Sequence, residues 1–280
     1  MFPIAKRSLV LIDAFSLGTL RYALGIPIFV ALLWAVEGRQ AFNYGTRLWP
    51  AIGFGLVGIT GFNTLVWYGL NFTRPEHASI LMAMQSPLTA LAFWALYGMR
   101  PSRFTVGCII AAITGVALVV TKGDLSRAFE GGSLAGDLII LLGALCWVAY
   151  SMAGGRFTGW SALRMTTLTC IPGGLGLIVV NLAAVSVGAV HTPSVEIIAS
   201  VWWQLIYFAA GSVVLGVLGF NAGVRHLGAL NTMLMLNLIP VGVFAIEAAL
   251  GRTFATVEIA GAALVIGALA INNFYLRRAR

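Results

Sequence analysis

The sequence predicts an all-α integral membrane protein, because of its composition, its long apolar runs and the short breaks between those runs. Of its 280 residues, 60% are hydrophobic and 9% are charged, and the mean hydropathy is +0.95. Soluble domains carry roughly 45–50% apolar and about 25% charged residues, so this chain lacks the polar surface that water requires. A soluble domain, a disordered tail and a nucleic-acid-binding module are therefore excluded.

Nine apolar runs follow one another, and each is long enough to form a membrane-spanning helix. About 20 apolar residues cross a hydrocarbon core of roughly 30 Å. In order, the runs cover residues 16–36, 48–70, 77–97, 104–121, 134–153, 165–187, 199–222, 229–250 and 254–275. The breaks carry the Gly, Pro and charged residues that end helices, and none is long enough for an extramembrane domain. We therefore expect the function to lie within the bilayer.

The distribution of positive charge predicts the orientation, since Lys and Arg are retained on the cytoplasmic side. One set of alternate loops holds ten such residues and the other holds six, within a net charge of +8. The bias predicts a multi-pass inner-membrane protein whose C-terminus is cytoplasmic. The ten are Arg39, Arg47, Arg100, Arg103, Arg156, Arg164, Arg225, Arg277, Arg278 and Arg280.

An internal repeat relates the two halves of the chain. Placing Pro87 on Pro240 also places Gly98 on Gly251, and a polar, Met-rich segment precedes each proline. Many transporters consist of two repeats of opposite orientation. Because a mid-helix proline removes a backbone hydrogen bond, we predict that Pro87 and Pro240 are hinges.

These features resemble the EamA-type transporters of the drug/metabolite transporter superfamily. The resemblance rests on a first helix that ends like Phe2 to Lys6, followed by Arg21 in the second helix. It also rests on Ala78 to Gly98 and Asn231 to Gly251, which both combine small and polar residues, a mid-helix proline and a terminal glycine. The order and repetition of these motifs cover nearly the whole chain.

The resemblance implies a ten-helix-type bundle of two inverted five-helix repeats. The first repeat is expected at residues 1–123, with its N-terminal helix incomplete, and the second at residues 133–276. Many relatives have a Glu just after the turn glycine, where this chain has Met99 and Arg252. The usual charge pairing at those helix ends is therefore not expected here.

Two charged residues inside the runs are candidates for function, because intramembrane charges usually face a protein interior or a water-filled cavity. Arg21 could bind a carboxylate or phosphate of a substrate, or could pair with a backbone carbonyl or snorkel to the interface. Glu247 could carry a coupled proton, or could be a helix-end carboxylate bonded to a neighbour. Asp137 lies near the start of its run, where its negative charge stabilises the positive end of the helix dipole, so we expect it to cap the helix and not to bind a ligand.

Uncharged polar and aromatic residues supply the other candidates for substrate binding, since a pocket is usually an apolar box with a few oriented polar groups. The alternative for each is packing or hydrogen bonding between helices. These candidates are Asn63, Trp67, Tyr68, Gln85, Trp147, Tyr150, Asn221 and Asn237.

Several rival classes lack the residues they need. The sequence has no G-x-x-x-x-G-K-[ST] loop for ATP and no H-E-x-x-H motif. Both lysines lie in loops, which excludes a retinal protein, and Cys108, Cys146 and Cys170 have no second ligand at metal-binding spacing. We expect no catalytic residue, no metal and no cofactor.

The sequence therefore favours a secondary active transporter of small organic metabolites that works by alternating access around a central cavity. The resemblance implies an amino-acid or related metabolite exporter. The expected partners are a small-molecule substrate and the lipid bilayer, with no nucleic acid, and the driving force is either a proton gradient or the substrate gradient alone. Import, multidrug efflux and nucleotide-sugar exchange stay open within the transporter class. A metal-free membrane enzyme acting on a lipid-linked substrate is the alternative from another class.

Overall fold

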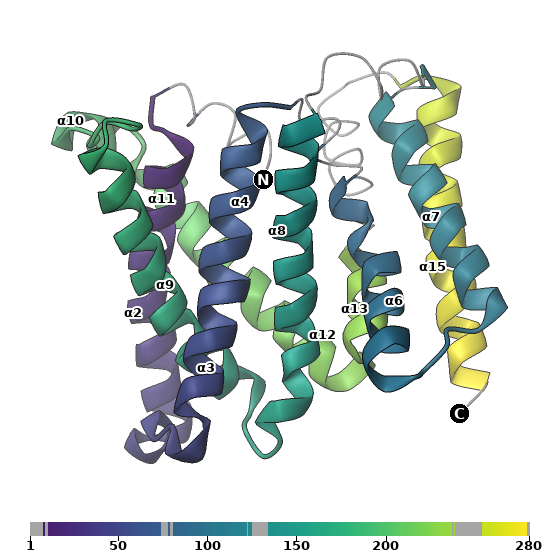
Figure 1. The fold of residues 1–280 in the computed structure, drawn as a ribbon, viewed down its shortest axis with the longest axis horizontal. Coiled ribbons are helices and arrows are strands. Elements are labelled where there is room, and N and C mark those ends of the chain that lie inside the picture. Colours follow the sequence, from purple (N-terminus) through teal and green to yellow (C-terminus); the bar gives the residue numbers. More distant parts are fainter. Residues whose placement is uncertain are drawn as a thin grey trace. The chain divides into compact units, whose positions relative to one another are not determined.

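All the regular elements in the part of the chain that the structure describes are helices (Figure 1). The structure is a computed structural model, and it describes residues 8, 11–73, 78, 81–121, 123–124, 134–236, 238 and 254–278. The candidates Asn237, Pro240 and Glu247 lie outside these residues. Within them, the prediction of an all-α fold is confirmed.

The helices coincide within a few residues with the predicted apolar runs wherever the structure describes them. The first half contains α2 (Ala14–Glu37), α3 (Leu48–Gly55), η3 (Leu56–Gly61), α4 (Phe62–Leu70), α6 (Gln85–Tyr97) and α7 (Arg103–Thr121). The second contains α8 (Leu134–Met152), α9 (Ala162–Ser186), α10 (Val195–Ser200), α11 (Trp202–Tyr207), η6 (Phe208–Val217), α12 (Leu218–Leu227), α13 (Ala229–Leu236) and α15 (Thr256–Arg278). Short 3₁₀ turns are η1 (Arg39–Phe42), η2 (Gly45–Arg47) and η5 (Ala153–Phe157).

Five helical stretches of the described chain are long and apolar enough to cross a membrane, by length and composition. Two further apolar stretches, Arg103–Val119 in α7 and Thr256–Asn272 in α15, are shorter. The five stretches are Phe15–Glu37, Arg39–Leu70, Leu134–Phe157, Ala162–Ser186 and Trp202–Leu227.

The chain divides into two compact units that cut across the two predicted repeats. Unit 1 comprises Met1–Trp67 and Ala149–His226, and unit 2 comprises Tyr68–Val148 and Leu227–Arg280. In unit 1, α2 and α3 pack against α9, and η6 packs against α2. Each unit therefore takes helices from both halves of the sequence, because helices from the two halves bury their faces against one another.

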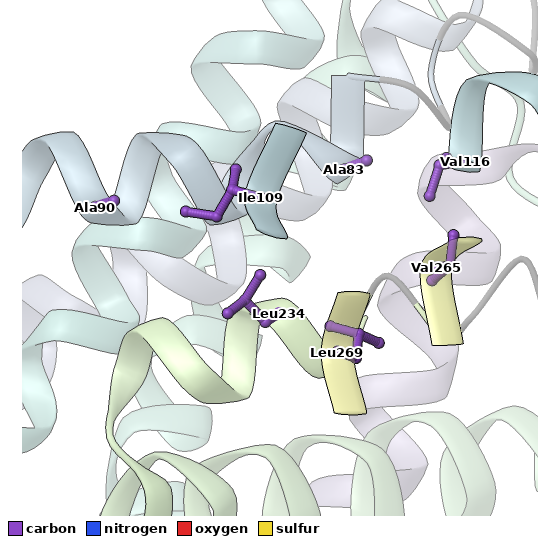
Figure 2. Packing of buried hydrophobic residues seen from close by; sticks show 7 residues of the cluster. All are labelled: Ala83, Ala90, Ile109, Val116, Leu234, Val265 and Leu269. Atoms are coloured by element: carbon purple, nitrogen blue, oxygen red, sulfur yellow. The ribbon is translucent and has the colours of Figure 1, made fainter. Parts of the chain in front are cut away.

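Unit 2 is organised around the pair α7 and α15, which lie side by side (Figure 1). An added Cβ at Gly115 of α7 would lie 2.6 Å from the carbonyl oxygen of Gly261 in α15. Small residues thus let the two backbones approach closely, as is usual where lipid supplies no hydrophobic drive between helices. Figure 2 shows the adjoining apolar cluster, which contains Ala83, Ala90, Ile109, Val116, Leu234, Val265 and Leu269.

Capping residues mark the N-termini of α2 and α9 and the C-terminus of α2. The Asp13 carboxylate accepts hydrogen bonds from the backbone N–H groups of Phe15 and Ser16, each at 2.9 Å. The Ser161 hydroxyl accepts from the N–H of Arg164 at 2.9 Å. A side-chain oxygen at the N-cap satisfies an N–H that has no partner inside the helix. Gly38 ends α2 with φ 75°, a conformation that favours glycine.

Close glycine packing in unit 1 distinguishes glycines that look equivalent in the sequence. An added Cβ would overlap the carbonyl oxygen of Thr169 at Gly55 and the Tyr150 side chain at Gly58, whereas Gly53 meets nothing within 4 Å. Other helices therefore pack closely at Gly55 and Gly58 and not at Gly53.

We expect Gly58→Ala to destabilise the protein and Gly53→Ala to stabilise it. Overpacking against Tyr150 costs about 1–3 kcal/mol. Alanine in an unobstructed helix gains about 0.5–1 kcal/mol over glycine. Thermal unfolding of the two variants in detergent measures both effects, and a stabilised Gly58→Ala variant would contradict the packing of η3 against Tyr150.

Candidate functional site

A buried arginine is the centre of the candidate site in unit 1. Arg21 on α2 is 7% exposed, and its Nη2 donates to the Oδ1 of Asn63 on α4. Asn63 is 2% exposed and donates from Nδ2 to the carbonyl oxygen of Ile59 at 2.6 Å. The guanidinium lies 5.6 Å from the ring centre of Tyr22 and 5.7 Å from that of Trp67. An amide and two aromatic rings therefore hold the arginine in place.

The positive charge of Arg21 has no carboxylate to balance it among the residues that the structure describes. Its Nε is buried and has no hydrogen-bond partner. Asn63 is neutral, and the two ring contacts are weaker than an ion pair. Since burying an unpaired charge is costly, the site is suited to an anionic group from outside the chain.

A second buried polar cluster lies in the same unit and is neutral. Nδ2 of Asn221 on α12 donates to the hydroxyl of Tyr150 and to that of Thr166, each at 2.8 Å. The Tyr150 hydroxyl also lies 3.0 Å from Oγ1 of Thr169. Oδ1 of Asn221 is buried without a hydrogen-bond partner, so this cluster has a free acceptor.

The two clusters occupy corresponding places in the two halves of the sequence. Asn63 ends the tripeptide Gly61-Phe62-Asn63, and Asn221 ends the identical tripeptide Gly219-Phe220-Asn221. When the N-cap Asp13 is placed on the N-cap Ser161, Arg21 falls on Thr169. The internal repeat therefore yields one charged and one uncharged cluster of similar design.

A π-helical segment precedes each of the two buried asparagines. η3 ends at Gly61, two residues before Asn63, and η6 ends at Val217, four residues before Asn221. The backbone N–H of Phe62 donates to the carbonyl of Val57, five residues back. Such segments are rare and are frequent at functional sites. Both π-helical segments therefore end within about one helical turn of a buried asparagine.

A small pocket adjoins Arg21 through two of its partners. Asn63 and Trp67 line it together with Phe15, Gly18, Thr19, Thr64, Leu177 and Val180. Its volume of about 10 Å³ matches a single water molecule. The Thr64 hydroxyl is buried without a hydrogen-bond partner. The site is therefore closed to a substrate in this conformation, with unused polar groups at its wall.

Hydrogen bonds to backbone carbonyls tie this region to α9. The Thr60 hydroxyl of η3 donates to the carbonyl of Gly173 at 2.7 Å. The Thr19 hydroxyl of α2 donates to the carbonyl of Leu177 at 3.4 Å. The two long helices in this region contain prolines that the sequence-based prediction of hinges did not include, Pro27 inside α2 and Pro172 inside α9. A proline inside a helix leaves the carbonyl four residues earlier without its usual donor. In α9 this carbonyl is that of Leu168, and it accepts a hydrogen bond from the Tyr44 hydroxyl at 3.1 Å.

The predicted binding residues divide between the two units. Arg21, Asn63 and Trp67 come together in unit 1, and Tyr150 and Asn221 meet in the same unit. Unit 2 contains Tyr68, Gln85 and Trp147. Tyr68 is 46% exposed and stacks edge-on against Phe72. Gln85 and Trp147 are buried, and Nε2 of Gln85 donates to Sδ of Met82 at 3.5 Å.

The predicted hinge Pro87 also lies in unit 2, within the first turn of α6. The chain makes a turn at Met84, directly before this helix begins at Gln85. A proline is accommodated in the first turn, where its missing N–H has no intrahelical partner.

Sequence reasoning missed Tyr22, Thr166 and Thr169, which complete the two clusters. The repeat did not reveal Thr169, because the shift that places Pro87 on Pro240 places Arg21 on Gly174, whereas the helix N-caps in the structure place it on Thr169. Groups of three or more His, Cys, Asp or Glu that could bind a metal are absent from the described residues. The three cysteines are free thiols.

The sequence profile of the EamA-like transporter family matches residues 1–121 and 134–274. The chain belongs to the EamA-like transporter family. It is 30% identical to the Bacillus subtilis (strain 168) protein named uncharacterized transporter YrdR, over 99% of this chain and 88% of that protein. It is 31% identical to uncharacterized transporter YyaM of the same organism, over 95% of this chain and 86% of that protein.

A crystal structure of a protein with 18% sequence identity has the same fold. It superposes with a TM-score of 0.77, covering 100% of this chain and 93% of the other. Membership of the EamA-like family makes this chain a multi-pass membrane transporter of the drug/metabolite transporter superfamily, and the double match to the family confirms the fold of two inverted repeats.

Proposed function

We propose that this EamA-like protein is a secondary active transporter of small organic metabolites that carry an anionic group, with amino acids or related metabolites as the substrate class and export as the direction. The observation that carries the proposal is the buried Arg21, which has no balancing carboxylate among the described residues and has an unpartnered Nε. A guanidinium binds a carboxylate through two parallel hydrogen bonds, so a carboxylate-bearing solute would complete the site.

The surrounding groups support binding of a zwitterionic or polar solute. Tyr22 and Trp67 offer ring faces, and the Thr64 hydroxyl and Asn221 Oδ1 are unused polar atoms. Because the pocket beside Arg21 holds only about one water, substrate entry requires the helices of unit 1 to move apart. Alternating access provides such a movement, in which repeats rock around a binding site.

The hinges, the coupling residue and the orientation are further parts of the proposal and rest on the sequence. Pro87 and Pro240 are assigned as hinges, and Glu247 as the carrier of a coupled proton. Asn237 and the unit 2 residues Tyr68, Gln85 and Trp147 are retained as candidates for substrate contacts. The C-terminus is assigned to the cytoplasmic side of the inner membrane from the distribution of Lys and Arg.

Uptake into proteoliposomes tests the function directly. Labelled amino acids, organic acids, an uncharged sugar and a cationic drug are compared, each with and without an imposed pH gradient. We expect accumulation of carboxylate-bearing solutes and little uptake of the sugar or the drug. Uptake of the cationic drug alone would favour multidrug efflux, and chemical conversion of a lipid-linked substrate without solute uptake would establish the enzyme alternative.

We expect Glu247→Gln to keep substrate exchange and to lose its dependence on the pH gradient, because the amide keeps the shape of the carboxyl and cannot titrate in this range. The same liposomes measure both. Glu258→Gln is the matched control, because the Glu258 carboxylate is committed to the N-terminus of α15, where its Oε2 accepts from the N–H of Ala255 at 2.9 Å. Unchanged pH-driven transport in Glu247→Gln would return this residue to a structural role.

A further inference from the structure

Five arginines gather at one end of unit 1, away from the Arg21 cluster. They are Arg39, Arg47, Arg156, Arg164 and Arg225, which lie in or beside the segments that join α2 to α3, α8 to α9 and α12 to α13. Among the described residues of this end, the acidic one is Glu37, and it accepts a hydrogen bond from the Ser161 hydroxyl. None of the five guanidinium groups forms an ion pair within the described chain, so this end has a strong excess of positive charge.

A surface pocket lies between two of these arginines. Its volume is about 460 Å³, and it is lined by Gln40, Asn43, Tyr44, Gly45, Thr46, Arg47, Trp160 and Arg164. The guanidinium groups of Arg47 and Arg164 lie 5.8 Å and 4.8 Å from the ring centre of Trp160. The volume falls in the range of roughly 300–1,000 Å³ that is typical of small-molecule sites.

The pocket is held in shape by hydrogen bonds to backbone carbonyls. Arg47 donates to the carbonyl of Thr158 and, at 3.3 Å, to its hydroxyl. Arg164 donates from Nη2 to the carbonyl of Asn43 at 2.7 Å, while its Nε is buried without a hydrogen-bond partner. Arg225 donates to the carbonyl of Trp160 at 2.6 Å. Both lining guanidiniums are thus positioned in advance, and one has a free donor.

Exposed aromatic residues place this pocket at the level of the lipid headgroups. Trp34, one turn before the end of α2, is 68% exposed, and Trp49, at the start of α3, is 77% exposed. Tryptophan is enriched where the hydrocarbon core meets the headgroups. The segment Gly38–Arg47 that forms much of the pocket lies between these two helix ends, so the pocket opens at the same depth.

We propose that this pocket binds the phosphate group of an anionic lipid. Arginine recognises phosphate bidentately, and basic pockets at membrane-facing helix ends bind anionic headgroups. Tyr44 and Trp160 supply amphipathic rings, and Gln40 and Asn43 supply polar groups for the rest of a headgroup. The end of unit 1 that carries the pocket is also the one that the arginine distribution predicts to be cytoplasmic, where anionic lipid gives the leaflet a negative surface potential.

Native mass spectrometry of the full-length chain tests this site. Phosphatidylglycerol, phosphatidylcholine and inorganic phosphate are titrated separately into the purified protein in detergent. We expect saturable binding of phosphatidylglycerol and weaker binding of the zwitterionic lipid. Inorganic phosphate that binds as tightly as the anionic lipid and displaces it would overturn the assignment to lipid in favour of a soluble phosphate.

Two double variants distinguish the contribution of the pocket to lipid binding from that of the overall positive charge at this end of unit 1. Arg47→Gln with Arg164→Gln removes the pocket arginines, and Arg39→Gln with Arg156→Gln removes the same charge from exposed positions that do not line it. We expect at least about tenfold weaker phosphatidylglycerol binding in the first, because charge-assisted hydrogen bonds are lost. The second should lose less than about threefold. Equal losses would overturn the proposal.

The single variant Arg164→Lys covers the case in which the pocket double variant does not fold. It keeps the charge and loses the planar fork, so phosphatidylglycerol binding should still weaken by about tenfold. Binding unchanged from the natural chain would show that Arg164 contributes charge alone, which contradicts a positioned phosphate site. Thermal unfolding in lipid-free detergent provides the check on folding for every variant.

Discussion

Arg21→Lys is expected to raise the half-saturation constant for carboxylate-bearing solutes by about tenfold to a hundredfold. A hydrogen bond to a charged group contributes about 1.5–3 kcal/mol, and about 1.4 kcal/mol corresponds to a factor of ten. Lysine keeps the charge and loses the second parallel hydrogen bond that the guanidinium fork provides. Initial rates of uptake into proteoliposomes, measured over a range of solute concentrations, give this constant.

The control for this prediction is the variant Arg39→Lys, because Arg39 is exposed at the end of unit 1. The half-saturation constant of this variant should match that of the natural chain. Uptake of any uncharged solute that the protein accepts should also be unchanged in Arg21→Lys, since the ammonium replaces one cation by another. Unaltered kinetics for carboxylate-bearing solutes would show that Arg21 stabilises the helix bundle and does not bind substrate.

The helices could be predicted from the sequence because the property that defines them is local. A run of apolar residues of the right length is enough to predict a span such as α2 or α9, and Gly, Pro and charged residues mark its ends. The interior candidates Asn63, Tyr150 and Asn221 are buried because polar side chains in an apolar helix seek partners on neighbouring helices. These residues were predicted by type, without knowledge of their partners.

The parts that sequence reasoning missed depend on contacts between distant segments. Tyr150 of α8 contacts Thr169 of α9, and Arg21 of α2 donates a hydrogen bond to Asn63 of α4. The compact units also divide the chain differently from the repeats, since helix packing follows complementary faces and not sequence order. The close approach of Gly58 in η3 to the Tyr150 side chain is another such contact between distant segments.

Replacing the buried asparagine by aspartate should affect thermal stability differently in the charged cluster and in the neutral one. In Asn63→Asp the new carboxylate lies beside Arg21 and supplies the negative charge that the described chain does not provide there. The ion pair offsets the lost hydrogen bond to the carbonyl of Ile59, so we expect little change in thermal stability. Transport of carboxylate-bearing solutes should fall by at least about tenfold, because the new carboxylate occupies the hydrogen-bond donors that the substrate requires.

Asn221→Asp is the same chemical change in the cluster that lacks a cation. The hydroxyls of Tyr150 and Thr166 can turn to donate to the new carboxylate, but no positive charge in the described part of the cluster balances it. An uncompensated buried charge costs about 3–5 kcal/mol, so this variant should unfold at a clearly lower temperature than Asn63→Asp. Thermal unfolding in detergent and solute uptake, measured on both variants, decide the question. Equal destabilisation would mean that Arg21 is already neutralised within the protein, and normal uptake by Asn63→Asp would remove the arginine from substrate binding.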